Sequence, residues 1–149
     1  MSTLLELLRA AKASGDYQPL IEAIPYNRWL GIGYELAGDD WVSVLRFHDK
    51  LVGNPAIPAL HGGTLGALLE TTAIFQLFWE AETVALPKTI TLTIDYLRSA
   101  APRDTFAKGI ITKHGRRVVT VRAVAWQDDR DKPVATANVH LLVTPPPER

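Results

Sequence analysis

The chain has 149 residues, of which 47% are hydrophobic and 21% are charged, and its formal net charge is zero. This composition is typical of a globular protein, and it lacks the basic excess that nucleic-acid-binding proteins usually carry. The chain contains no cysteine, which excludes disulfides, thiolate metal sites and a cysteine nucleophile. We therefore expect a single domain over residues 1–149 without a nucleic-acid partner.

The N-terminal segment, residues 1–25, is predicted to be helical. A capping-box pattern at Thr3 and Glu6 precedes leucines at helical spacing, and a second short helix is expected to end before Pro25. Charged side chains interrupt the apolar run of this segment, so it lacks the pattern of a secretory signal. No run in the chain reaches the roughly 18 apolar residues of a membrane span. These patterns predict a cytoplasmic protein without a membrane partner.

The next segment is predicted to form a β-hairpin followed by a loop. Residues 30–36 and 41–47 are rich in β-branched and aromatic residues, and turn-forming residues 38–40 separate them. Residues 48–60 contain one glycine and two prolines, which disfavour regular structure. We expect an ordered loop there.

Residues 62–80 are predicted to form one long buried helix. Apolar side chains occupy nearly its whole circumference, which is typical of a helix enclosed by other elements. After Pro87 the hydrophobic period changes to two, which predicts a strand with one buried face. The apolar residues of that face are Ile90, Leu92, Ile94 and Tyr96.

Three further alternating segments, 105–113, 118–126 and 134–143, predict a meander of strands, and residues 145–149 are expected to be a flexible tail. The strands lack crossover helices, so the class is α+β with a mostly antiparallel sheet. We expect a curved sheet of five to six strands wrapped around the long central helix, with the helical segment as an N-terminal extension. This is the arrangement of the hotdog fold.

Glu70 is the most informative residue of the long helix. None of its helical neighbours at i±3 and i±4 is charged, and no lysine or arginine occurs between Lys50 and Lys88. A carboxylate in such surroundings must reach solvent, find a distant donor or keep its proton through a raised pKa. The position indicates a functional acid, and a partly exposed helix stripe is the alternative explanation.

His61-Gly62-Gly63 lies where the long helix is expected to begin. Two glycines let a ligand approach the backbone closely, and the first amides of a helix are unpaired donors supported by the helix dipole. The turn therefore suits an oxyanion. We place His61 and Gly62 in the candidate catalytic site and Gly63 next to the substrate. A flexible helix start, with His61 as a cap or a buried histidine, is the alternative.

Gly62 and Glu70 are eight residues apart, which is about 12 Å of helix rise. An oxyanion donor and a base must each lie within about 3 Å of the reacting groups, so one straight helix does not easily bring both to one carbonyl. Two helices related by a twofold axis do, with Gly62 of one subunit facing Glu70 of the other. The chemistry therefore predicts a dimer with two equivalent sites.

Residues 55–70 resemble a segment of the hotdog acyl-CoA thioesterases of the phenylacetate-degradation type, in the 4-hydroxybenzoyl-CoA thioesterase-like superfamily. The specific feature is an acidic residue nine positions after the histidine. The likeness continues through residues 89–98, 115–116 and 133–135, and it covers much of the chain from 30 to 143. It implies hydrolysis of an acyl-CoA by a homodimer or a dimer of dimers, without a cofactor beyond the CoA of the substrate.

The same resemblance assigns roles to individual residues. Glu70 attacks the thioester carbonyl or activates a water, and the Gly62 amide polarises that carbonyl. Thr89 falls where some members hold a serine or threonine near the nucleophile. Asn54 could orient the carbonyl or the water, although it lies seven residues before His61 where members often have six, and a proline replaces a glycine of the pattern.

Two further groups of side chains are candidates for substrate contacts. Basic residues crowd around a predicted turn, where they could contact the CoA phosphates or form a solvated turn: Lys113, His114, Arg116 and Arg117. Aromatic residues of the long helix could line an acyl pocket or belong to the core: Phe75, Phe78 and Trp79.

Three functions are open at this point. The first is thioester hydrolysis by Glu70 and the Gly62 amide, which needs neither a metal nor a redox cofactor. The second is an acyl-CoA-binding hotdog protein that does not cleave its ligand. The third is a hotdog hydratase or dehydratase, in which a histidine and an acid share the proton transfers. Neither His48 nor His61 has the shorter interval to the acid that is associated with that family.

Overall fold

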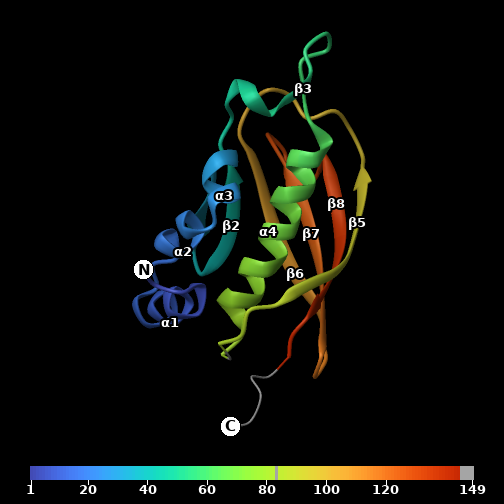
Figure 1. Ribbon diagram of the computed structural model, residues 1–149. Coiled ribbons are helices and arrows are strands. Elements are labelled where there is room, and N and C mark those ends of the chain that lie inside the picture. The colour runs from blue at the N-terminus through green and yellow to red at the C-terminus, as the bar shows by residue number, and fades with distance from the viewer. Residues whose placement is uncertain (83, 145–149) are drawn as a thin grey trace.

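The structure, a computed structural model, describes residues 1–82 and 84–144. A long helix packs across one face of a six-stranded sheet, and the N-terminal helices lie beside it (Figure 1). The predicted tail, 145–149, lies outside the described residues. The elements, in chain order, are α1 (Leu4–Ser14), α2 (Gln18–Ala23), α3 (Pro25–Leu30), β1 (Ile32–Ala37), β2 (Asp40–Leu45), the 3-10 turn η1 (Asp49–Leu51), β3 (Val52–Asn54), β4 (Ala59–Leu60), α4 (Gly62–Glu80), β5 (Lys88–Tyr96), β6 (Thr105–His114), β7 (Val118–Trp126) and β8 (Ala135–Leu142).

The sheet has the strand order β1-β2-β6-β7-β8-β5, and every neighbouring pair is antiparallel. β6, β7 and β8 form the predicted meander, and β5 pairs with β8 at one edge. The predicted α+β class and hotdog arrangement are confirmed. Within the described chain, the outer edge of β5 has no partner strand.

The long helix has the predicted bounds, and its inner face fills the core. Leu68 and Leu69 are fully buried against strand residues such as Val121 and Val139. Alternate side chains of β7 and β8 point toward the helix, as period two requires. Each fully buried aliphatic side chain contributes roughly 1.5–3 kcal/mol, and together they fix α4 against the sheet.

The N-terminal segment forms three helices, where the sequence predicts two. Residues 25–30 form α3 instead of leading directly into a strand, because proline is well tolerated at the first position of a helix. Gly31, with a φ of 81°, ends α3 in the left-handed conformation. The first strand therefore begins at Ile32 rather than at Leu30.

Aromatic residues join α4 to the N-terminal helices. Phe75 is 1% and Phe78 is 5% exposed, and Trp41 stacks on Phe75 with ring centroids 5.4 Å apart. Both phenylalanines thus belong to the buried core, although Phe78 also borders a pocket described below, while Trp79 is partly exposed. Lys12 of α1 donates from Nζ to the carbonyl oxygen of Phe78 at 2.6 Å, near the end of the helix, and burial lowers the pKa of this lysine.

β5 departs from the predicted alternation near its first residues. Thr89 lies opposite Leu141 of β8 and Thr91 lies opposite His140, so Ile90 is the extra residue of a bulge. Opposed residues of an antiparallel pair share a face, and Leu141 is buried, so Thr89 takes the place of Ile90 on the face toward α4. Ile90 is 55% exposed. The prediction that Ile90 lies on the buried face is wrong.

The predicted loop at 48–60 contains regular structure. After η1, β3 and β4 form a small hairpin that projects beyond the N-terminal end of α4 (Figure 1). The backbone N–H of Leu60 donates to the carbonyl oxygen of Ala100 at 2.9 Å, which links the hairpin to the loop that follows β5.

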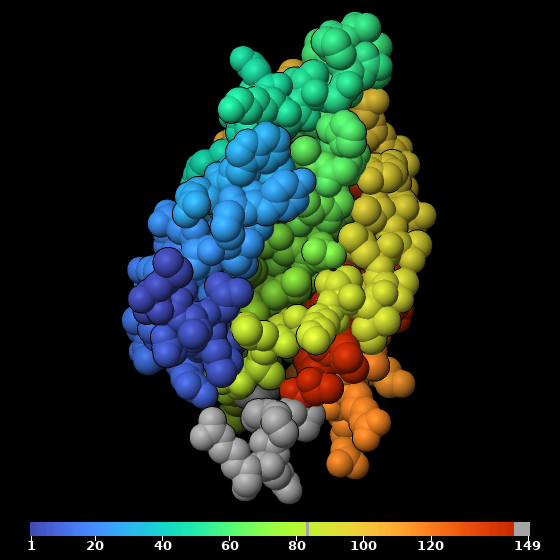
Figure 2. Space-filling model, in the orientation of Figure 1, coloured from blue at the N-terminus to red at the C-terminus, as the bar shows by residue number. Residues whose placement is uncertain are grey.

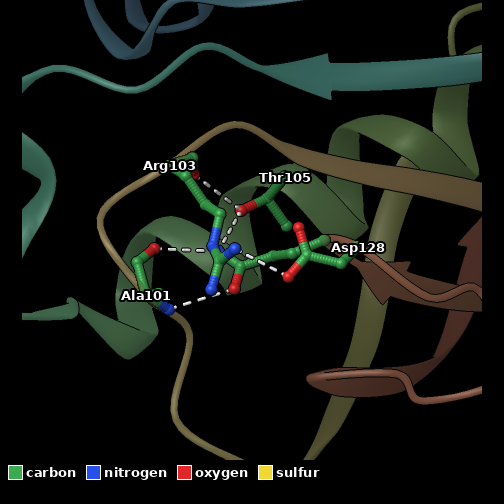
Figure 3. Close-up of polar contacts among 5 residues, drawn as sticks. Ala101, Arg103, Thr105 and Asp128 are labelled. Atoms are coloured by element: carbon green, nitrogen blue, oxygen red, sulfur yellow. Dashed lines mark hydrogen bonds and ion pairs between the residues drawn. The ribbon is translucent and has the colours of Figure 1, made fainter.

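The loop after β5, residues 97–104, is fixed by contacts from the turn between β7 and β8. The Gln127 side chain exchanges two hydrogen bonds with the backbone of Ala101, at 2.8 and 3.0 Å. Arg103 forms an exposed ion pair with Asp128 at 2.6 Å (Figure 3), which contributes at most about 1 kcal/mol. These contacts hold the end of β5 beside the start of α4.

Candidate active site

The peptide bond between His61 and Gly62 presents a free N–H group at the start of α4. Its carbonyl oxygen, that of His61, accepts hydrogen bonds from the backbone N–H of Thr64 at 2.9 Å and from the Thr64 hydroxyl at 2.6 Å. Its N–H, that of Gly62, has no hydrogen-bond partner among the described residues. The first N–H groups of a helix carry the positive end of the dipole. This amide is the one that the sequence predicts as the oxyanion donor.

The next peptide bond, between Gly62 and Gly63, is held at both ends. The N–H of Gly63 donates to Nδ1 of His61 at 2.8 Å, so His61 is the N-cap of α4 and its Nδ1 is unprotonated. The hydroxyl of Tyr96 donates to the carbonyl oxygen of Gly62 at 2.8 Å. A Cβ on Gly62 would lie 3.1 Å from the Tyr96 ring, so a glycine at this position permits the close approach.

Glu70 lies in the middle of α4 and is half-buried. At 3.6 residues per turn, its direction falls between that of Gly66, which faces β5, and that of Ile74 on the outer side. Thr71, on the opposite flank, donates to Asn27 of α3 at 3.3 Å. Glu70 forms no hydrogen bond or ion pair with any described residue. Its carboxylate is therefore unpaired and lies on the flank of the helix nearer β5.

A strip of α4 is uncovered between the N-terminal helices and β5 (Figure 2). On the outer side of α4, Gly63 is exposed, and four further residues are only partly buried: Ala67, Glu70, Thr71 and Ile74. In the single chain, Glu70 therefore lies on a partly exposed stripe of the helix. The strip lies beside the outer edge of β5, which has no partner strand in the described chain.

Within one chain Gly62 and Glu70 do not meet. They lie on the same uninterrupted helix, eight residues and about 12 Å apart. The single chain thus has the donor and the acid at separate places, as the spacing predicts.

Asn54 and Thr89 occupy other parts of the fold. Asn54 ends β3 in the projecting hairpin, where its Oδ1 accepts a hydrogen bond from the N–H of Ala56 at 3.0 Å. Thr89 lies near the start of β5 and, because of the bulge, on the face toward α4. Tyr96, which contacts Gly62, is at the opposite end of the same strand.

The four predicted basic residues lie at the end of α4 opposite Gly62. Lys113, His114, Arg116 and Arg117 are all exposed at the turn between β6 and β7. A pocket of 430 Å³ next to this turn is lined by His114 and Arg116 and by apolar residues of α4, including Phe78.

A second pocket, of 410 Å³, adjoins Gly62 at the start of α4. Tyr96, Arg98 and Leu60 line it together with the glycine. Tyr96, Arg98 and Thr64 are not among the residues predicted for the site. The alternation of β5 indicates only a core-facing position for Tyr96, and nothing in the sequence marks the contact with Gly62.

In the described part of the chain, no group of three or more histidine, cysteine, aspartate or glutamate side chains could hold a metal ion. None of the helices in residues 1–82 and 84–144 has the length and apolar character needed to cross a membrane.

Known proteins share both the sequence pattern and the architecture. The pattern of the thioesterase superfamily matches residues 58–134. A protein from Chromobacterium violaceum is 36% identical, with a TM-score of 0.75 over 92% of this chain and 96% of its own. A phenylacetic acid degradation-related protein from Ralstonia eutropha is 25% identical, with a TM-score of 0.70 over 80% of this chain and 90% of its own.

A more distant structure was solved with a ligand. It is a Bacillus halodurans protein with CoA, 19% identical, with a TM-score of 0.75 over 97% of this chain and 93% of its own. At this identity the likeness concerns the fold. Among curated proteins, none matches the chain.

Proposed function

The chain belongs to the thioesterase superfamily, and from this premise we propose that it hydrolyses an acyl-CoA thioester to a free acid and CoA. The observation that carries the proposal is the free Gly62 amide at the start of α4, with an unpaired acid, Glu70, on the same helix. Among the described residues neither group has a structural partner that would explain its presence.

In the proposed reaction the Gly62 N–H binds the thioester carbonyl oxygen and stabilises the negative charge that develops there. Glu70 either attacks the carbonyl carbon or removes a proton from an attacking water. The tetrahedral intermediate then collapses, the C–S bond breaks, and the CoA thiolate takes up a proton. If Glu70 is the nucleophile, water hydrolyses the resulting anhydride. Neither route requires a metal or a redox cofactor.

We further propose that the site forms between two copies of the chain. The outer edge of β5 has no partner strand, and exposed apolar residues lie on or next to it: Leu86, Ile90, Tyr96 and Leu97. A second copy paired at this edge would cover the strip of α4 and bring its Gly62 toward Glu70 of the first. The functional unit is then a dimer, or a dimer of dimers.

Ile90→Lys tests this interface. Ile90 is 55% exposed next to the edge of β5, so a lysine there is expected to shift the protein from twice the chain mass of 16.4 kDa, or a multiple, toward monomer and to lower hydrolysis in parallel. Ile110, 52% exposed on β6 away from this edge, provides the matched control Ile110→Lys. Light scattering and turnover are measured together, and an active Ile90→Lys monomer would refute the shared site.

The exposed basic turn between β6 and β7 is proposed to bind the phosphates of CoA. The CoA-bound structure from Bacillus halodurans, which has the same fold, supports this ligand class. Charge reversal at Arg116 is expected to raise the KM for acyl-CoA about tenfold, because a charge-assisted contact is lost. The KM for an acyl-N-acetylcysteamine thioester, which lacks phosphates, should not change. Arg122→Glu, on an exposed position of β7, is the control.

Thiol release from acetyl-, hexanoyl-, palmitoyl- and phenylacetyl-CoA tests the proposed activity. Hydrolysis of at least one of these substrates is expected, at a rate that saturates with substrate. Stoichiometric retention of acyl-CoA without thiol release would instead identify a binding protein, and water addition to an enoyl-CoA would identify a hydratase.

A further inference from the structure

Tyr96 touches the candidate oxyanion donor from a different element of the fold. It is the last residue of β5, and its hydroxyl donates to the carbonyl oxygen of Gly62 at 2.8 Å. The Tyr96 ring also lies within 3.1–3.2 Å of the position that a Cβ on Gly62 would occupy. The contact spans 34 positions of sequence and joins the sheet edge to the first residue of α4.

The backbone at Gly62 and Gly63 needs external restraint. Glycine has more conformational freedom than any other residue, and the first turn of a helix lacks the hydrogen bonds that hold the interior. Oxyanion stabilisation depends on a donor that is already oriented before the charge develops. Two consecutive glycines would otherwise let the donor amide rotate.

The surrounding contacts restrain both peptide units of Gly62. Thr64 fixes the carbonyl of the preceding unit, while His61 Nδ1 and the Tyr96 hydroxyl hold the N–H and the carbonyl of the following unit. In the described residues, the Gly62 N–H is the one polar group of these two units without a partner. A carbonyl has two lone pairs, so the Tyr96 hydrogen bond is compatible with the helical one.

We infer that Tyr96 is a positioning residue of the thioesterase site. By holding the carbonyl of Gly62, it restrains the backbone of this glycine so that the free N–H of Gly62 points at the substrate carbonyl. The inference rests on the proposed function. Tyr96 acts through the backbone of Gly62 and does not itself exchange protons with the substrate. The two hydrogen bonds between the Gln127 side chain and the backbone of Ala101 fix the chain that follows Tyr96 and so support its position.

Tyr96→Phe removes the hydroxyl and keeps the ring that packs on Gly62. The substrate for this test is the one of the four acyl-CoAs named above that the wild type hydrolyses fastest. Its kcat is expected to fall about three- to tenfold, the effect of one lost hydrogen bond, with KM unchanged. The melting temperature and the oligomeric mass should stay at wild-type values. Tyr26→Phe, at a tyrosine that is 57% exposed on α3, is the matched control and should leave kcat unchanged.

A spectroscopic measurement separates positioning from a purely structural role. The infrared carbonyl stretch of the same substrate, labelled with ¹³C at the thioester carbonyl, is recorded bound to Glu70→Gln and to Glu70→Gln/Tyr96→Phe. The amide should lower the frequency in the first variant, and the second should move it back toward the value in solution.

The outcomes distinguish failure of the proposed function from failure of the inference about Tyr96. A wild-type protein that hydrolyses none of the four acyl-CoAs overturns the proposed function and this inference with it. An active wild type with an unchanged kcat and carbonyl frequency in the Tyr96→Phe variants overturns the inference alone. A parallel loss of stability, KM and kcat would also overturn it, since Tyr96 would then be a structural residue.

Discussion

Glu70→Gln is expected to lower kcat about 10³-fold, the range in which loss of a general base or nucleophile usually falls. The amide side chain has nearly the same size and neither attacks a carbonyl nor accepts a proton from water. Glu70 makes no hydrogen bond or ion pair with the described residues, so the free energy of unfolding should change by less than about 1 kcal/mol. Steady-state thiol release and chemical denaturation measure the two effects.

Glu80→Gln is the matched control for this substitution. Glu80 ends the same helix and is exposed, and it accepts a hydrogen bond from Gln76 at 2.8 Å. Its replacement should leave kcat near the wild-type value. Hydrolysis at an undiminished rate by the Glu70→Gln protein would remove this acid from the mechanism.

Gly62→Pro is expected to lower kcat about 10²- to 10³-fold more than Gly62→Ala, the effect of removing one oxyanion donor. Both substitutions add a Cβ that crowds the Tyr96 ring at 3.1 Å, but only proline removes the N–H. Proline is favoured at the first position of a helix, and His61, with φ −64° and ψ 129°, has the extended conformation that precedes proline. Comparison of the two variants therefore isolates the amide from the steric effect.

Steady-state kinetics and circular dichroism are measured for both the Gly62→Ala and the Gly62→Pro protein. The helical signal and the melting temperatures of the two variants should agree closely. Equal kcat values for the alanine and proline variants would show that the Gly62 N–H takes no part in the reaction.

Hydrophobic periodicity was sufficient to predict the elements that are enclosed by the core. α4 has the predicted bounds because its apolar residues surround the helix, and strands β6 to β8 follow their alternation closely. Periodicity failed where the local structure depends on strand pairing or where an element is too short to show a period. The bulge at Ile90 depends on the register with β8, which no local pattern contains. The six residues of α3 are too few for a clear helical period.

In the candidate site, too, some residues could be predicted from local patterns and others only from contacts in the structure. Glu70 and Gly62 could be selected from the sequence because an unneutralised acid and a glycine pair are unusual at these places in a helix. Tyr96 and Thr64 could not, because their roles depend on two hydrogen bonds to backbone carbonyls. A strand residue 34 positions away from its contact carries no local sign of it. The second copy of the chain was predicted from helix geometry alone and is still a prediction.

The shared site between two copies is tested most directly by mixing two inactive variants. Glu70→Gln and Gly62→Pro are each expected to be nearly inactive as homodimers. If each site takes the acid from one copy and the amide from the other, a mixed dimer has one intact site and one doubly defective site.

Equal amounts of the two variants, unfolded and refolded together, should recover about one quarter of wild-type activity, because half of the dimers are mixed and each has one of two sites. The separately refolded variants, combined afterwards under conditions without subunit exchange, provide the baseline. Recovery to about one quarter is expected of a site that two copies of the chain share. A co-refolded mixture that contains mixed dimers but stays at the baseline would contradict it.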